Sequence, residues 1–245
     1  MLIGTVAVAA VLIAVVLVSI SQVPQGLGQT IPYSLSYTVG EKLTYSLSIS
    51  LSANGQQVDE TGTMTMQIVS FDGDNYTINE ATQFEVQGVS YENNLTEIIN
   101  KEGQLVAAPN LPPQLQSYYS IIQGSPGNSM FLNRTEIQVG QTIQIPISFS
   151  NATMTMTGTE NVKVAAIENI TVTAGTYKTF RLDISTSNFQ VSSQGVVATL
   201  SFTGYVHMDY DTCRVVDFNL QGTSSAEGET VSITINSALT GDTTS

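Results

Sequence analysis

The chain has very little of the side-chain chemistry that most enzyme sites need. Its 245 residues include one cysteine, one histidine and no tryptophan. Because His207 stands alone, a zinc site built from several histidines is excluded, and a Ser-His-Asp triad would have no other base. Cys213 cannot form a disulfide within the chain, so we expect it to be a small buried apolar residue. No phosphate-binding glycine loop, Cys-x-x-Cys pair or dinucleotide fingerprint is present.

Positive charge is also scarce. Seven Lys and Arg stand against twenty Asp and Glu, which gives a formal net charge of −13. A nucleic-acid partner is therefore not expected, because phosphate binding needs a basic surface. The acidic pairs Asp72/Asp74 and Asp209/Asp211 lack the full ligand set of a calcium loop, although the spacing of the second would put both carboxylates on one face of a strand. We predict no enzyme, no catalytic residue, no metal and no cofactor.

The N-terminus is an uncharged apolar run. Residues Leu2 to Ile20 would span roughly 28 Å as a helix, and they are apolar on every face. Ser19-Ile20-Ser21 and Gly26-Leu27-Gly28 have the small-x-small form of signal-peptidase sites, and no Lys or Arg follows before Lys42. We predict that residues 1–28 are a cleaved apolar leader and that the rest is extracellular or on the cell surface. Contact with a membrane would be limited to export or to this leader.

Alternating hydrophobicity dominates everything after the leader. From Ile31 to Val39 every odd position is apolar and every even position is small, polar or proline. The alternation resumes after Gly40, with turn signals at Asn54-Gly55 and at Asp72 to Asn75. These patterns predict an all-β fold, with an N-terminal tail over residues 29–40 and an Ig-like or β-sandwich-type body over residues 41–245. Later strands are expected around Glu136–Phe149, Asn161–Val172, Tyr177–Ser187, Gly195–Tyr210, Cys213–Gln221 and Val231–Leu239.

A proline-rich segment interrupts the strands and separates two similar halves. Residues 108–128 contain four prolines and are expected to form a long crossover with one short helix, so the body could divide there into two sub-domains. Across it, Val39-Gly40-Glu41 parallels Val139-Gly140-Gln141, and Thr61-Gly62-Thr63 parallels Thr157-Gly158-Thr159. We interpret this as an internal repeat in which each half opens with a Val-Gly turn.

Five N-x-[ST] sequons occur in the chain. In an exported protein such asparagines are acceptors for N-linked glycans. The pattern places three of the five at turns (Asn75, Asn94 and Asn169) and one, Asn151, at a strand end. We predict N-glycosylation at Asn75, Asn94, Asn133, Asn151 and Asn169.

The apolar leader, the uncharged alternating tail, the acidic Ser/Thr-rich body, the sequons and the lack of a disulfide together resemble the subunit of the thin "thread" filaments of thermoacidophilic crenarchaea. In that family the N-terminal strand of each subunit enters the next and completes its sheet. The resemblance implies an N-glycosylated homopolymer, assembled head-to-tail, with a role in adhesion or biofilm formation. The donor positions it implies are Ile31, Tyr33, Leu35, Tyr37 and Val39, with Pro32 at a point where no ladder donor is needed.

Two alternatives remain. The first is a type IV pilin-like or archaellin-like subunit that keeps its N-terminal helix, although Pro24, Gly26 and Gly28 would break that helix early. The second is a monomeric secreted β-domain, either a binding module or a hydrolase. The N-terminal residue of the mature protein separates the donor-strand subunit, which would start near Gln22 or Gln29, from the pilin, which would start at or before Leu2.

Overall fold

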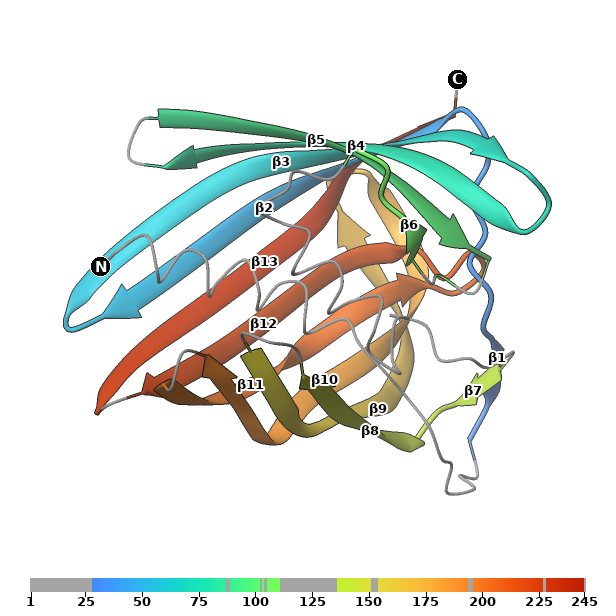
Figure 1. The fold of residues 1–245 in the computed structure, drawn as a ribbon. Coiled ribbons are helices and arrows are strands. Elements are labelled where there is room, and N and C mark those ends of the chain that lie inside the picture. The colour runs from blue at the N-terminus through green and yellow to red at the C-terminus, as the bar shows by residue number, and fades with distance from the viewer. Residues whose placement is uncertain are drawn as a thin grey trace.

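A computed structural model describes residues 28–86, 89–101, 103, 105–110, 136–150, 154–193, 196–226 and 228–244. The regular elements in these residues are strands, so the all-β prediction is confirmed (Figure 1). The predicted leader and most of the crossover lie outside the described residues. The strands are β1 (Thr30–Pro32), β2 (Glu41–Ala53), β3 (Gln56–Phe71), β4 (Asn75–Val86), β5 (Val89–Asn100), β6 (Leu105–Ala107), β7 (Glu136–Gln138), β8 (Thr142–Ser150), β9 (Met154–Val172), β10 (Gly175–Ser193), β11 (Val196–Asp209), β12 (Val215–Ala226) and β13 (Glu229–Thr244).

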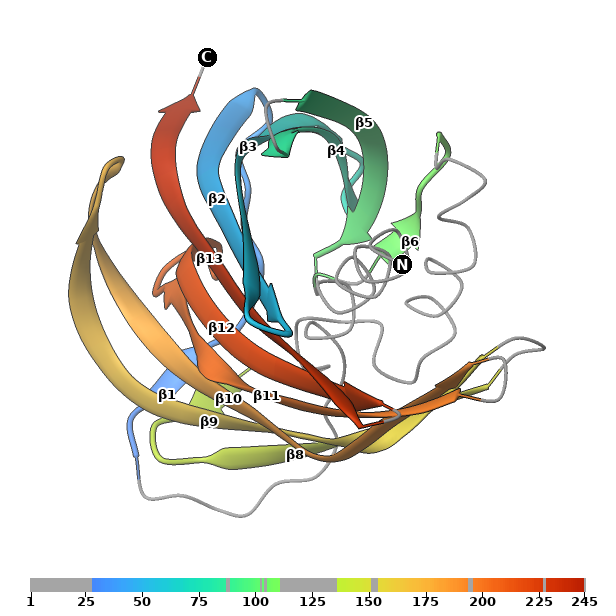
Figure 2. The same cartoon turned by 90° about the vertical axis from the view of Figure 1, so that its left-hand side faces the viewer.

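Eleven of the strands form one antiparallel sheet in the order β6-β5-β4-β3-β2-β13-β12-β11-β10-β9-β8. The first half of the chain supplies one side of the sheet, the second half supplies the other, and the β2–β13 pair joins them. The sheet is strongly curved, so that β3 to β5 arch above β8 to β11 (Figure 2). The predicted sandwich-type body is built from this one continuous sheet, whose two halves face each other across a shared core. Twist and several register shifts, such as those in β10, favour this curvature.

Turn chemistry fixes the first hairpins where the sequence predicts them. Asn54 and Gly55 both have positive φ, 51° and 75°, which suits the tight turn between β2 and β3. The Asp72 carboxylate accepts hydrogen bonds from the amides of Asp74, at 2.9 Å, and Asn75, at 2.7 Å, in the turn between β3 and β4. Asp72 and Asp74 are therefore turn residues, as expected.

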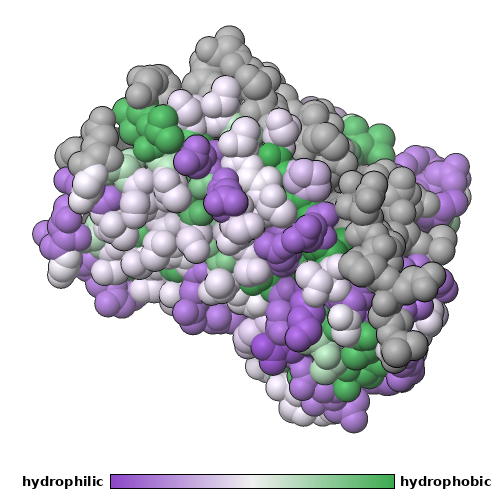
Figure 3. Space-filling model, turned by 90° about the horizontal axis from the view of Figure 1, so that it is seen from below, coloured by the Kyte–Doolittle hydropathy of each residue, from purple (hydrophilic) through white to green (hydrophobic). Residues whose placement is uncertain are grey.

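Alternation along the strands sends one set of side chains to a shared core. In β8, Ile143, Ile145 and Ile147 are buried while the residues between them are exposed. The main core cluster extends from these residues to Ile49 of β2, and Phe84 of β4 packs against it, so the core spans both halves of the sheet. Polar and weakly polar residues dominate the face in Figure 3, with green patches that are small and separate. The hydroxyl-rich strands thus keep their apolar sides inward.

The repeated Val-Gly segments occupy equivalent positions. Gly40 has φ 90° and Gly140 has φ 88°, a backbone conformation that favours glycine. The Gly40 amide donates to the Ile68 carbonyl at 2.9 Å, and the Gly140 amide donates to the Val164 carbonyl at 2.7 Å. Each turn therefore docks on the second strand of its own hairpin, β3 in one case and β9 in the other.

The equivalence continues along both hairpins. Gly62 lies opposite Leu47, and Gly158 lies opposite Ile147. Each glycine lies beneath an aromatic ring of the third strand, since an added Cβ would come within 2.8 Å of Phe84 at Gly62 and within 2.7 Å of Phe189 at Gly158. The structure thus places the two similar sequence segments at matching points of two meanders. The division of the body into sub-domains stays a prediction.

Candidate functional site

The N-terminal tail crosses one end of the curved sheet. In Figure 1 it is the blue segment that descends along the right-hand side, from the turn before β2 to β1 and β7. β1 pairs antiparallel with β7, with Ile31 opposite Ile137, and these two strands form a separate small sheet. Residues 33–38 are extended without being assigned to a strand. The tail is therefore outside the large sheet.

The apolar side chains of the tail enter the core. Ile31 is 0% exposed, and Tyr33 and Leu35 are each 3% exposed, whereas the even-numbered residues between them face solvent. The Tyr33 ring packs at 6.0 Å from the Phe180 ring of β10. Burial raises the pKa of Tyr33 well above its ordinary value, so its hydroxyl stays neutral. The predicted alternation thus holds at the first three donor positions.

The alternation weakens toward the turn. Tyr37 is half-buried and packs edge-on against Tyr76, with ring centroids 5.4 Å apart. Val39 is 52% exposed, because it is the first residue of the turn that leads into β2. The inward-facing positions in the described chain are therefore Ile31, Tyr33 and Leu35, with partial burial at Tyr37.

Backbone contacts of the tail reach both halves of the sheet. The Leu35 amide donates to the Lys101 carbonyl at 3.2 Å, beyond the end of β5. The Ser36 amide donates to the Thr212 carbonyl at 2.9 Å, in the turn between β11 and β12. Next to Thr212, the buried Cys213 thiol lies 3.7 Å from the Pro32 carbonyl. We call the surface formed by these partners and the core around Phe180 the seat of the tail.

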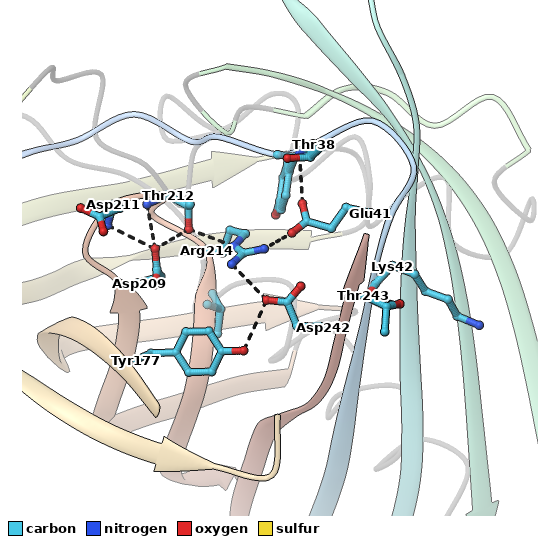
Figure 4. A network of polar contacts seen from close by, with 12 residues as sticks. Thr38, Glu41, Lys42, Tyr177, Asp209, Asp211, Thr212, Arg214, Asp242 and Thr243 are labelled. Carbon is cyan, nitrogen blue, oxygen red and sulfur yellow. Dashed lines mark hydrogen bonds and ion pairs between the residues drawn. The ribbon is translucent and has the colours of Figure 1, made fainter. Parts of the chain in front are cut away.

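A charged network lies beside the hinge between the tail and β2 (Figure 4). Arg214 forms an ion pair with Glu41 through Nη1, and its Nη2 donates to Asp242 at 3.2 Å. The side chains of Arg214 and Glu41 are only 12% and 5% exposed. Burial acts to lower the pKa of Arg214, but the charges of Glu41 and Asp242 outweigh it and raise that pKa, so the guanidinium stays charged.

Sequence reasoning missed this network as a site. The one signal that could have pointed to it is that Arg214 is one of only seven Lys and Arg residues and follows the single cysteine. Asp209 and Asp211 also differ from their predicted arrangement. Asp209 ends β11, and its carboxylate accepts hydrogen bonds from the amides of Asp211 and Thr212, so the two acids belong to a turn rather than to one strand face.

His207 lies on the outer face of the sheet, opposite the core. Its Nδ1 is 2.6 Å from Asp217 and its Nε2 is 3.0 Å from Glu168. Burial disfavours the charged ring, but the hydrogen bonds and charges of these two carboxylates raise its pKa above the usual value. Both ring nitrogens are engaged by carboxylates, so neither is available as a base for a nucleophile. Among the described residues no group of three or more His, Cys, Asp or Glu has metal-binding geometry.

Two glutamates on the inner side of the sheet are poorly solvated. Burial, together with the charge of Glu97, raises the pKa of Glu80 to about 7. Burial also raises the pKa of Glu160, whose Oε2 has no hydrogen-bond partner among the described residues. Both groups therefore favour the neutral carboxylic acid.

Three of the five predicted glycosylation positions lie in described residues. Asn75 begins β4 next to the Asp72 turn, as predicted. The turn placement of the other two is wrong, since Asn94 lies within β5 and Asn169 lies within β9. Both side chains are nevertheless on exposed residues. Asn133 and Asn151 fall outside the described residues.

Comparisons with known proteins identify no family for this chain. No protein-family model and no curated protein sequence matches it. One similar solved structure is described as an exported protein with a YmcC-like fold from Bacteroides fragilis; it is 9% identical, with a TM-score of 0.37 over 86% of this chain and 99% of that one. Another is described as a lipoprotein from Parabacteroides distasonis; it is 11% identical, with a TM-score of 0.38 over 88% of this chain and 100% of that one. The described residues contain no helix long and apolar enough to span a membrane.

Proposed function

We propose that this protein is an extracellular structural subunit that assembles with copies of itself by placing its N-terminal tail in the seat of a neighbour. One observation carries the proposal. Ile31, Tyr33 and Leu35 are buried in the core although they belong to a segment that is not part of the large sheet. In the described chain the tail fills its own seat. The same side chains would make the same contacts in a second copy, which is the principle of strand exchange between subunits.

The connection between tail and body suits such an exchange. A single turn centred on Gly40, with φ 90°, links the tail to β2, so a change of backbone angles there would redirect the whole tail. Each subunit offers one tail and one seat, which allows exchange to run head-to-tail from one copy to the next. An assembly of this kind that does not close into a ring grows as a filament.

The edges of the large sheet are less suited to polymer growth. The edge strand β8 contains Pro146, which has no amide hydrogen to donate to an added strand. At the other edge, β6 covers Ile98 and Ile99 of β5. The Asn110 side chain accepts from the Thr96 amide at 2.6 Å on the same strand. Tail exchange is therefore favoured over edge-to-edge pairing.

The remaining sequence features fit an exported filament. The apolar segment Leu2–Ile20 would direct export, and Asn94 and Asn169 are exposed positions at which glycans could project. An N-glycosylated surface filament of the thread type would serve adhesion or biofilm formation. N-terminal sequencing of the mature protein tests this scheme against a pilin-like subunit, because a start at or before Leu2 would indicate a retained helix.

The exchange is tested by charging the buried side of the tail. We expect Tyr33→Asp with Leu35→Asp to be secreted but not to form polymers in negative-stain electron microscopy. Ser34→Asp with Ser36→Asp is the matched control, because it adds the same charge to the same segment at exposed positions. Wild-type protein that stays monomeric at every concentration, or filaments unchanged in the first variant, would contradict the proposal and favour a monomeric secreted binding module.

A peptide separates loss of exchange from simple misfolding. In the Tyr33→Asp, Leu35→Asp variant the seat should be vacant, so a synthetic peptide of residues 29–39 is expected to bind it. The same peptide carrying both aspartates should not bind. Binding can be followed by fluorescence anisotropy of a labelled peptide, and failure of the wild-type peptide to bind a folded variant would count against a seat that works between chains.

A further inference from the structure

We propose that Arg214 is a latch that controls how readily the tail leaves its seat. The inference starts from the two backbone anchors nearest the hinge. The Ser36 amide donates to the Thr212 carbonyl at 2.9 Å, and the Thr38 amide donates to Glu41 Oε2 at 3.0 Å. Both bonds must break when the tail swings out about Gly40. The residues that position these two acceptors therefore control the stability of the seated tail.

Arg214 bonds to both residues that supply these acceptors. Its Nε donates to the Thr212 hydroxyl at 2.9 Å, and its Nη1 pairs with Oε1 of Glu41, which leaves Oε2 directed at the Thr38 amide. Its Nη2 bonds to Asp242 at 3.2 Å, which ties the whole group to the end of β13 (Figure 4). Because the guanidinium presents its donors in a rigid plane, one side chain can fix all three partners at once.

The second Val-Gly turn shows that the turn itself does not need this charge. There Gln141 Oε1 accepts from the Gln138 amide at 3.0 Å, the same distance as in the first turn. The backbone bond from the residue-141 amide to the Gln138 carbonyl, 3.0 Å, also matches the bond from Glu41 to Thr38. A neutral amide is sufficient to close the turn. The buried ion pair is an added feature of the turn that carries the tail.

Cys213 offers a direct report of tail release. It is the single cysteine, it is 1% exposed, and its thiol faces the Pro32 carbonyl of the tail. Burial raises its pKa to about 11, so the seated tail keeps the thiol both covered and protonated. Departure of the tail would uncover it, and a tail donated by a second copy would cover it again.

The experiment measures the rate at which N-ethylmaleimide labels Cys213 in dilute monomer. We expect Arg214→Gln to raise the rate by about ten- to hundredfold, as removal of charged hydrogen bonds from a local opening equilibrium predicts. Arg214→Lys keeps the positive charge but loses the planar set of guanidinium donors, so its labelling rate should lie between those of wild type and Arg214→Gln. Arg181→Gln is the control, because Arg181 pairs with Asp183 on the outer face and should leave the rate unchanged.

Amide hydrogen exchange distinguishes local release from global unfolding. In Arg214→Gln the amides of residues 35–38 should exchange through an opening that depends little on low urea concentrations, while those of β10 around Phe180 should stay slower and accelerate steeply with urea. A labelling rate equal to wild type, or exchange of residues 35–38 that is as slow and as urea-dependent as that of β10, would overturn the latch.

A role of the latch in assembly rests on the proposed function, but the latch proposal and the filament proposal can fail separately. If Arg214→Gln speeds labelling and also speeds filament growth, both stand. If labelling is faster but wild type and variant remain monomeric, the latch stands and the filament proposal falls. If filaments grow while labelling is unchanged, the filament proposal stands and the latch falls.

Discussion

The two Val-Gly turns share a backbone and differ in the side chain that closes them. Gly40 and Gly140 have nearly the same φ. In each turn a side-chain oxygen accepts a hydrogen bond from the backbone amide three residues earlier in the chain. In the first turn that oxygen belongs to Glu41, which also meets Arg214, and in the second it belongs to Gln141. The comparison teaches that the fold requires only an acceptor at this position. The carboxylate appears where a long tail must be fixed beside the sheet.

The largest expected effect comes from removing the cation at the first turn. Arg214→Met would leave the buried Glu41 without its charged partner, and breaking a buried ion pair costs about 3–5 kcal/mol. We expect a loss of that size in the free energy of unfolding, measured by urea titration. Adding Glu41→Gln should recover a large part of it, because the first turn then has the neutral chemistry of the second. A double variant no more stable than Arg214→Met would show that the turns are not equivalent.

The next prediction tests the match between the two hairpins. Gly62→Ala and Gly158→Ala would each push a methyl group into a neighbouring strand, where Phe84 and Phe189 lie within 3 Å of the new atom. Overpacking of this kind costs about 1–3 kcal/mol. We expect similar losses at both sites by urea unfolding. Thr61→Ala and Thr157→Ala, at exposed adjacent positions, should change stability by less than about 0.5 kcal/mol. A large loss at one glycine only would break the equivalence.

A smaller effect is expected at the turn glycines. Gly40→Ala and Gly140→Ala would place a side chain at φ near 90°, which costs about 1–2 kcal/mol in the left-handed region. At Gly140 the added atom meets nothing within 4 Å, so strain alone accounts for the loss. Thermal unfolding should show comparable decreases for the two variants. If only Gly40→Ala also accelerates labelling of Cys213, the hinge role is specific to the first turn.

The last prediction concerns pH, and each half of the sheet contributes one group. Glu80 in the first half has its pKa raised from 4.5 to about 7, and His207 in the second half has its pKa raised above 6.5. A raised pKa means that the folded state binds the proton more tightly than the unfolded state does. Protonation of these two groups therefore stabilises the fold at low pH, and this stabilisation is lost as the pH rises. The loss should fall between pH 4.5 and about 7 for Glu80 and above 6.5 for His207.

Two variants assign this pH dependence. Glu80→Gln should flatten the decline in the free energy of unfolding between pH 4.5 and 7. His207→Gln should remove the decline above pH 6.5, with a modest amplitude because Glu168 is partly exposed and screened. Unfolding curves taken at several pH values provide the measurement. A stability that rises steadily from pH 4.5 to 8 in wild type would contradict the assignment.

Strand positions and tight turns could be predicted from local pattern. The alternation at Ile31, Tyr33 and Leu35, the Asn54-Gly55 turn and the parallel between Gly40 and Gly140 all appear in the structure as the pattern indicates. These features depend on neighbours in sequence, where side-chain period and glycine conformation act directly. The turn placement of Asn94 and Asn169 failed because polar residues on the exposed face of a strand resemble turn residues in composition.

Residue spacing alone is sufficient to predict that the protein is all-β, that its tail alternates and that its two halves begin alike. The joining of the strands into one curved sheet through the β2–β13 pair depends on folding, because strand neighbours far apart in sequence leave no local pattern. The same holds for the tail. Its alternation predicted a buried side, but the meeting of Glu41, Arg214 and Asp242 at its hinge depends on three segments brought together by folding.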